Sequence, residues 1–261
     1  MKNLLFIKVI LLLLISVYSS CGSSQENIED NSINEKNKSS LYPKDLMYFS
    51  QDFYLAVRYE DPINAYLDTL SKIDANLLEK DLNTHNKSLS FWINIYNALV
   101  QVKIINDKGS FENQQQFFKN KDLVVAGLNV SLDEIEHGIL RLKEYNNELV
   151  KRFMLDSIDY RIHFTMNCGA TSCPAIAYYK PETIQGDLKV AEKLFIKQNS
   201  TYDSFSNTLE ISELIKWFKD DFGGDKGIYK LMINNGIIQE DIKPIIKYKP
   251  YNWELKSKNY Q

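Results

Sequence analysis

The chain has 261 residues and a formal net charge of −3, and 16 tyrosines and 13 phenylalanines make it rich in aromatic side chains. Its mildly acidic balance and its lack of a basic block argue against nucleic acid as a partner. The roughly 220 residues after position 40 are enough for one sizeable hydrophobic core. We therefore expect a single globular domain over residues 41–261.

The N-terminus has the pattern of a secretory signal. Lys2 and Lys8 supply positive charge, an apolar run covers residues 9–17, and the small pair Ser19-Ser20 precedes Cys21. This order is typical of a signal peptide, and the run is shorter than the roughly 20 apolar residues of a transmembrane helix. A cysteine directly after the small residues is the mark of a lipoprotein signal, because its thiol accepts the lipid.

Residues 1–20 are therefore predicted to be a lipoprotein signal peptide. We expect lipid such as palmitate on Cys21 to hold the exported chain at a bacterial envelope membrane, the outer one. Removal of the signal peptide takes away two lysines and no acidic residue, which changes the net charge from −3 to −5. Residues 21–40 carry only Ile28 and Ile33 as large apolar side chains, too few to offset the entropy of ordering, which predicts a flexible tether.

The first part of the domain is predicted to be helical. Apolar residues recur at helical spacing over residues 45–60 and 62–80. Ser88-Leu89-Ser90 offers capping side chains to a third, very apolar helix over residues 91–105.

Short strands are predicted in the middle of the chain. Residues 122–130 alternate weakly around Gly127 and indicate a hairpin. Ser131 and Glu134 have the spacing of a capping box, which predicts that a helix begins there. Residues 161–167 alternate between apolar and polar side chains, a pattern that predicts a strand.

The last third is predicted to contain two more helices, over residues 181–198 and 211–222, the second stopped by Gly223-Gly224. Residues 244–253 combine prolines and aromatics and are expected to cross the surface as an ordered loop. The fold class that follows is α+β, a predominantly helical single domain with a small β-sheet.

Two cysteines in a polar turn carry the chemistry. Cys168 and Cys173 follow the predicted strand, and Gly169 would let a ligand approach the backbone closely. In an oxidising compartment they are candidates for a disulfide. Metal binding is the weakest alternative, because the paired ligand spacing of a zinc site is missing. A nucleophilic cysteine served by a histidine base is the third, since backbone N–H groups in a turn depress a thiol pKa.

The polar candidates beside these cysteines are few. His85 lies in a polar loop and is interpreted as solvated, whereas His137 follows Glu136, which could orient its ring. His163 is either a buried, hydrogen-bonded histidine or a base. Asn94 and Asn97 lie on the apolar helix over residues 91–105, and because buried amides need partners we expect them to hold a neighbouring loop.

Three motifs in order resemble the domain-of-unknown-function family 547. They are the FWINIYNA segment at residues 91–98, the IEHGILR segment at residues 135–141, and the run from His163-Phe164 through Asn167-Cys168-Gly169 to Ser172-Cys173-Pro174. Trp217-Phe218 followed by Asp221-Phe222 resembles a downstream element of the same family. The resemblance covers residues 88–222.

The resemblance implies a chemical role for Cys168, because the family's pattern keeps the Cys-Gly step but can carry serine at the position of Cys173. It also makes the Glu136-His137 pair a better partner for Cys168 than an isolated surface histidine would be. The leading hypothesis is a thiol hydrolase or acyl transferase with Cys168 as nucleophile and His137 or His163 as base, and with no cofactor and no metal. Its logic is similar to that of papain-like and transglutaminase-like enzymes, in permuted order.

The alternative hypothesis is a non-catalytic envelope module. It would bind a peptide, a glycan or a partner protein through its aromatic-rich surface, with Cys168 and Cys173 joined in a disulfide. Asn94, Asn97 and Cys173 are the candidate binding residues. The sequence names neither the substrate of the first hypothesis, whether peptide, glycan or acyl group, nor the ligand of the second.

Overall fold

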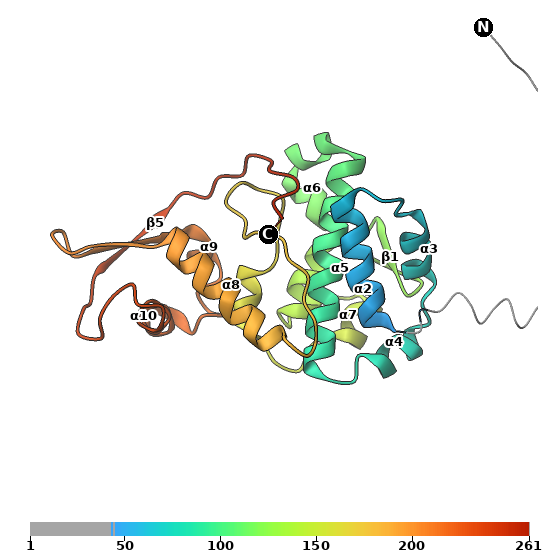
Figure 1. Ribbon diagram of the computed structural model, residues 1–261, viewed down its shortest axis with the longest axis horizontal. Coiled ribbons are helices and arrows are strands. Elements are labelled where there is room, and N and C mark those ends of the chain that lie inside the picture. Colours follow the sequence, from blue (N-terminus) through green and yellow to red (C-terminus); the bar gives the residue numbers. More distant parts are fainter. Residues whose placement is uncertain (1–42, 44, 261) are drawn as a thin grey trace, which may run out of the picture. The chain divides into compact units, whose positions relative to one another are not determined.

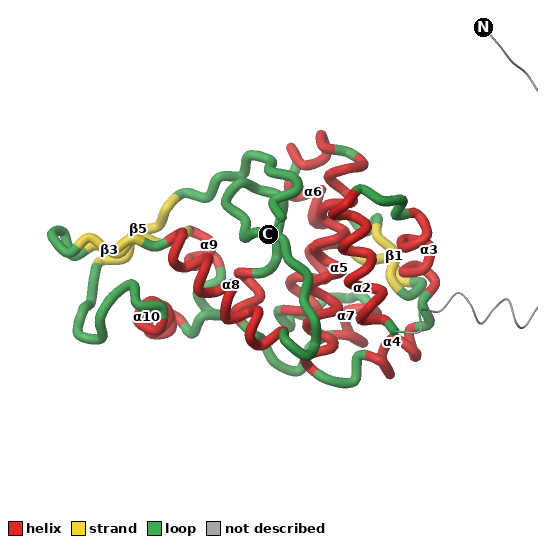
Figure 2. The backbone as a smooth tube through the Cα atoms, viewed as in Figure 1, coloured by secondary structure: helices red, strands yellow, loops and turns green. Residues whose placement is uncertain are grey.

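Helices dominate the computed structural model, which describes residue 43 and residues 45–260. Two small sheets accompany them, so the predicted α+β, predominantly helical class is confirmed (Figures 1 and 2). The signal peptide over residues 1–20, Cys21 and the tether over residues 21–40 lie outside the described residues. Within the described part of the chain, no helix combines the length and the apolar character needed to cross a bilayer.

The helices and strands have the following bounds along the chain. The helices are α2 (Leu46–Tyr59), α3 (Asn64–Lys72), α4 (Ala75–Asp81), α5 (His85–Asn106), η1 (Lys108–Glu112), α6 (Gln114–Lys119), η2 (Glu134–Leu140), α7 (Glu148–Phe153), η3 (Tyr160–Phe164), α8 (Ile184–Asn199), α9 (Glu213–Trp217) and α10 (Gly224–Asn234). The strands are β1 (Leu123–Val125), β2 (Leu128–Val130), β3 (Thr201–Asp203), β4 (Thr208–Ser212) and β5 (Ile245–Lys249).

Helix α5 is the central element of the larger hydrophobic cluster. Every residue from Leu89 to Val102 is buried, as expected of a helix that is apolar on all sides. It lies along α2 and contacts η1, η2 and α8 (Figure 1). The prediction that it begins near residue 91 is wrong: the cap is Thr84, whose hydroxyl accepts a hydrogen bond from the backbone N–H of Lys87.

The first predicted helix is confirmed, and the second is not continuous. Asp45 caps α2 by accepting hydrogen bonds from the N–H groups of Met47 and Tyr48. The predicted helix over residues 62–80 is divided into α3 and α4, because Asp74 lies in extended conformation and caps the second of them.

The hairpin and the capping box are both confirmed. Strands β1 and β2 pair antiparallel, with Leu123 opposite Val130. Ser131 and Glu134 exchange hydrogen bonds as the capping box predicts, at 3.0 Å and 3.1 Å. The turns that follow form η2, a π-helix, a form that is frequent at functional sites.

The second hydrophobic cluster contains α8, α9, α10 and the three-stranded sheet β3–β4–β5. Helix α8 confirms the helix predicted over residues 181–198, but only part of residues 211–222 is helical: Ile211 belongs to β4, and α9 is short. Gly223, which was predicted to end the helix over residues 211–222, lies directly before α10 and has φ +84°. Residues 244–253 are not all loop, because β5 pairs in parallel with β4.

The strand predicted over residues 161–167 is wrong. Asp159 caps a tight helical turn there by accepting a hydrogen bond from the N–H of Arg161, and residues 160–164 form η3. Every side chain from Ile162 to Asn167 is buried, so both the apolar and the polar members of the alternating pattern lie inside the protein. Alternation predicts a strand only when one set faces solvent, and here neighbouring elements cover both.

Candidate functional site

A cavity of about 470 Å³ is lined by parts of both clusters. Its residues come from α5, α6, η2, η3, α9 and the C-terminal segment, which are far apart in sequence. They include the four predicted catalytic residues, Cys168, His137, His163 and Glu136. The fold therefore brings together side chains that sequence reasoning selected separately.

His163 is the most deeply buried of these groups, with 3% of its surface exposed. Its Nε2 lies 2.8 Å from Oδ2 of Asp221, and its ring stacks on Phe218 at a centroid distance of 4.0 Å. Burial lowers the pKa of His163, which favours the neutral ring. Because a carboxylate only accepts, Nε2 carries the proton and Nδ1 keeps its lone pair. Among the described residues Nδ1 has no hydrogen-bond partner.

Asp221 holds two side chains at once. Its Oδ2 also accepts a hydrogen bond from Nε of Arg141, at 2.6 Å. Burial alone would raise the pKa of Asp221, but the hydrogen bonds from His163 and Arg141 outweigh it and hold that pKa well below its usual range. The carboxylate is therefore ionised, and it orients the imidazole as an acid partner orients a catalytic histidine.

Arg141 extends the network to the second histidine. Its Nη1 donates to Nδ1 of His137 at 2.9 Å, and its guanidinium lies over Phe218, 4.4 Å from the ring centroid. One arginine thus links His137 to Asp221 and, through it, to His163. Both histidines line the same cavity.

Two carboxylates face the cavity beside His137. Glu136 accepts a hydrogen bond from the hydroxyl of Tyr96 at 2.7 Å, and Asp133 accepts one from Tyr145 at 2.5 Å. Burial, followed by the charge of Glu136, raises the pKa of Tyr96 far above its ordinary value, so this hydroxyl remains a donor. In the described part of the chain neither Glu136 nor Asp133 forms an ion pair with a lysine or arginine.

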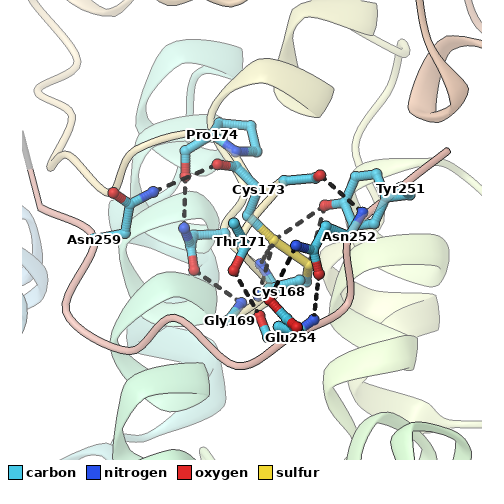
Figure 3. Close-up of a disulfide and its surroundings, with 12 residues drawn as sticks. Cys168, Gly169, Thr171, Cys173, Pro174, Tyr251, Asn252, Glu254 and Asn259 are labelled. Carbon is cyan, nitrogen blue, oxygen red and sulfur yellow. Dashed lines mark hydrogen bonds between the residues drawn. A yellow bond between two sulfur atoms is a disulfide. The ribbon is translucent and has the colours of Figure 1, made fainter. Parts of the chain in front are cut away.

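Cys168 and Cys173 are joined by a disulfide, with an S–S distance of 2.13 Å (Figure 3). This is the first of the three alternatives left open by the sequence. The described residues contain no group of three or more His, Cys, Asp or Glu side chains placed to hold a metal ion. Cys168 lines the cavity, whereas Cys173 lies behind it with 7% of its surface exposed.

The cysteine turn is held by buried amides. Asn97 on α5 donates from Nδ2 to the carbonyl of Thr165 and accepts from the N–H of Asn167, both at 2.9 Å. Asn94 makes the same reciprocal pair with the backbone of Tyr179, at 2.9 Å and 2.8 Å. This is the loop-holding role expected of the two asparagines, and neither lines the cavity.

Sequence reasoning did not select several residues that build the site. Asp221 appeared only within the downstream family element, although it binds His163 directly and is linked to His137 through Arg141. Trp217, Tyr251 and Trp253 form one wall, with ring centroids 4.9–5.8 Å apart. The signal that could have found this wall is the density of aromatics in the tail, which is unusual for a loop.

Comparison with known proteins gives one match. Residues 80–196 match the family model described as "Protein of unknown function, DUF547". The matched segment contains the three motifs that suggested this family and ends before Trp217. No curated protein and no solved structure matches the chain.

Proposed function

The chain belongs to the DUF547 family, and from this premise we propose that its domain is a binding module for a peptide that carries an amine beside a flat apolar group. The observation that carries the proposal is the composition of the cavity. The cavity is lined by the aromatic wall, which includes Trp217 with 42% of its surface exposed, and by the carboxylates of Asp133 and Glu136.

Charge and shape both favour a cationic ligand. An ammonium group is attracted to aromatic faces, and a carboxylate without a cationic partner adds to that attraction. Lys119 is the only lysine or arginine among the described lining residues, so the two carboxylates leave the cavity with an excess of one negative charge when the histidines are neutral. The apolar part of the ligand would pack on Tyr251 and Trp253.

The experiment compares two probes of the same shape. Phenethylamine and 2-phenylethanol share the phenylethyl group and differ in the terminal group, a charged ammonium in the first and a neutral hydroxyl in the second. Each would be titrated into the purified, oxidised full-length chain while tryptophan fluorescence is followed. We expect the amine to bind roughly tenfold more tightly. Equal affinity, or tighter binding of the alcohol, would contradict the proposal.

A pair of variants locates the charge that is responsible. Glu136→Gln keeps an acceptor for Tyr96 but removes the charge, and we expect it to abolish most of the preference for the amine. Glu144→Gln is the matched control, because Glu144 is exposed and does not line the cavity. A preference that survives Glu136→Gln would assign the selectivity to another group.

A thiol hydrolase or acyl transferase is the second candidate, for a reduced form of the chain. The observation in its favour is His163, an oriented imidazole whose Nδ1 has no hydrogen-bond partner among the described residues, in the same cavity as Cys168. In this form Cys168→Ala would abolish turnover and Cys173→Ser would leave most of it. Equal loss in both variants would exclude Cys168 as the nucleophile.

We also propose that lipid on Cys21 holds this module at a bacterial envelope membrane, the outer one, beyond a tether over residues 21–40. The support is the order of charge, apolar run, small residues and cysteine in the sequence. Cys21→Ser is expected to prevent incorporation of labelled palmitate in cells and to leave the chain unanchored. Palmitate label retained in Cys21→Ser would refute this attachment site.

A further inference from the structure

The two sulfurs of the disulfide differ in access and in hydrogen bonding. Cys168 lines the cavity, but Cys173 is buried behind it and does not. A thiol that enters the cavity therefore reaches the sulfur of Cys168 first.

The buried sulfur is the one surrounded by donors. Sγ of Cys173 accepts the N–H groups of Cys168 and Ala170 at 3.0 Å and 3.3 Å, and the hydroxyl of Tyr251 donates to it at 3.1 Å. The same hydroxyl lies 3.3 Å from Sγ of Cys168 (Figure 3). A disulfide sulfur is a weak acceptor, whereas a thiolate is a strong one, so these donors favour negative charge on Cys173.

The donors stay in place because a distant segment holds the turn. The N–H of Thr171 donates to the carbonyl of Glu254 at 2.8 Å (Figure 3). The N–H of Lys256 donates to the carbonyl of Gly169 at 2.7 Å. The N–H of Gly169 also donates to Oδ1 of Asn167, at 2.8 Å. None of these bonds involves a sulfur, so none of them depends directly on the disulfide.

We propose that Cys168–Cys173 is an exchangeable disulfide that oxidises thiols admitted by the cavity, with Cys168 as the sulfur attacked and Cys173 as the leaving thiolate. The incoming thiol gives its proton to solvent, and its sulfur bonds to Sγ of Cys168. The Cys168–Cys173 bond breaks, and its electron pair remains on Cys173.

The second step releases the protein. A second thiolate of the same dithiol, or of another monothiol, attacks the sulfur that the first thiol contributed, and Cys168 leaves as a thiolate that takes a proton from solvent. Two thiols are thereby oxidised to one disulfide, and the protein gains two electrons. A thiolate leaves faster when its pKa is lower, which is the chemical use of the donors around Cys173.

The decisive experiment uses the unmodified full-length chain and glutathione. The folded, oxidised protein is mixed with reduced glutathione, quenched with acid, alkylated and analysed as peptides by mass spectrometry. We expect glutathione on Cys168 and the alkyl group on Cys173. Glutathione on Cys173, or no reaction until denaturant is added, would overturn the proposal.

A tyrosine variant tests the stabilisation of the leaving group. Tyr251→Phe removes one donor from Cys173, and we expect dithiothreitol to reduce the disulfide about tenfold more slowly. Tyr229→Phe is the matched control, since it removes a hydroxyl that donates to the carbonyl of Pro244, at 2.8 Å. An unchanged rate in Tyr251→Phe would overturn the assignment of Cys173 as the stabilised thiolate.

The exchange does not rest on the proposed binding function. The amine titration uses the oxidised chain without thiols, and the glutathione reaction contains no amine probe. Failure of one experiment therefore leaves the result of the other unchanged.

Discussion

The imidazole of His163 and the carboxylate of Asp221 meet at 2.8 Å, although 58 residues separate them in sequence. Arg141 reaches the same carboxylate oxygen at 2.6 Å. Removing one partner of a buried arginine–carboxylate pair leaves the other charge buried without compensation. The contact between Arg141 and Asp221 is therefore expected to affect the stability of the fold as well as the chemistry of the cavity.

Asp221→Ala is expected to destabilise the fold by about 3–5 kcal/mol, because it leaves Arg141 buried without a counter-charge. Urea denaturation of the full-length chain measures the free energy of unfolding. Glu79→Ala is the control, since it breaks an exposed pair with Arg152 and is expected to cost at most about 1 kcal/mol. Similar losses in the two variants would contradict the role given to the buried network.

Stability is expected to fall as the pH decreases below about 6.5. Burial lowers the pKa of His163 in the folded state, so between that pKa and the ordinary one the unfolded chain binds a proton that the folded chain does not. The contribution is complete above this window and is lost as the pH falls through it. Asp221, whose folded-state pKa is also lowered, adds a second loss below about pH 4.

Urea midpoints measured from about pH 7.5 to 5.5 test the histidine component. His163→Gln keeps a neutral donor for Asp221 and is expected to flatten the decline. His85→Gln leaves the buried ring in place and serves as the control, because His85 lies at the surface beside Asp156. A decline in stability of the same size in wild type and His163→Gln would show that another group causes the pH dependence.

Asn97→Ala is expected to destabilise the fold by about 3 kcal/mol, because it leaves the carbonyl of Thr165 and the N–H of Asn167 buried without partners. Asn129→Ala is the control: it removes an exposed hydrogen bond to the carbonyl of Lys121. Thermal unfolding distinguishes the two. A loss in Asn97→Ala no larger than in the control would show that water replaces the amide.

Gly169→Ala is expected to destabilise the cysteine turn by about 2 kcal/mol or more, through a steric clash added to backbone strain. Gly169 has φ +90°, and a Cβ there would lie 2.6 Å from Cδ1 of Ile104. Ile104→Val removes that atom, so the double variant should recover the clash component of the loss. The free energy of unfolding of each variant gives the coupling.

Gly127→Ala is the matched control for strain alone. Gly127 has φ +76°, but nothing lies within 4 Å of a Cβ built there. We expect a loss of about 1 kcal/mol, which Ile104→Val does not change. Full additivity of Gly169→Ala and Ile104→Val would mean that the turn moves to admit the methyl group.

Local patterns predicted the elements that local forces stabilise. The helix over residues 45–60, the hairpin over residues 122–130 and the Ser131–Glu134 capping box depend on residues within a few positions of each other, and all three occur in the structure. Boundaries were less predictable: one predicted helix over residues 62–80 is two, because the side chain of Asp74 begins a new one.

Elements with distant partners were predicted wrongly. Two prolines made residues 244–253 look like loop, but Pro244 and Pro250 lie just outside the two ends of β5 and leave its N–H groups free to pair with β4. Residues 161–167 alternate like a strand, yet both sets of side chains are covered by elements far away in sequence.

For this protein, the sequence by itself determined the family, the helical fold class and four of the residues that line the cavity: Cys168, His137, His163 and Glu136. Only the tertiary structure decided that Cys168 is paired with Cys173, that Asp221 orients His163, and that Tyr251 and Trp253 of the C-terminal segment line the cavity. The physical reason is distance along the chain. Caps and periodicity act over a few residues, whereas the network around Asp221 and the contacts of Tyr251 form only when packing brings segments separated by 58–83 residues together.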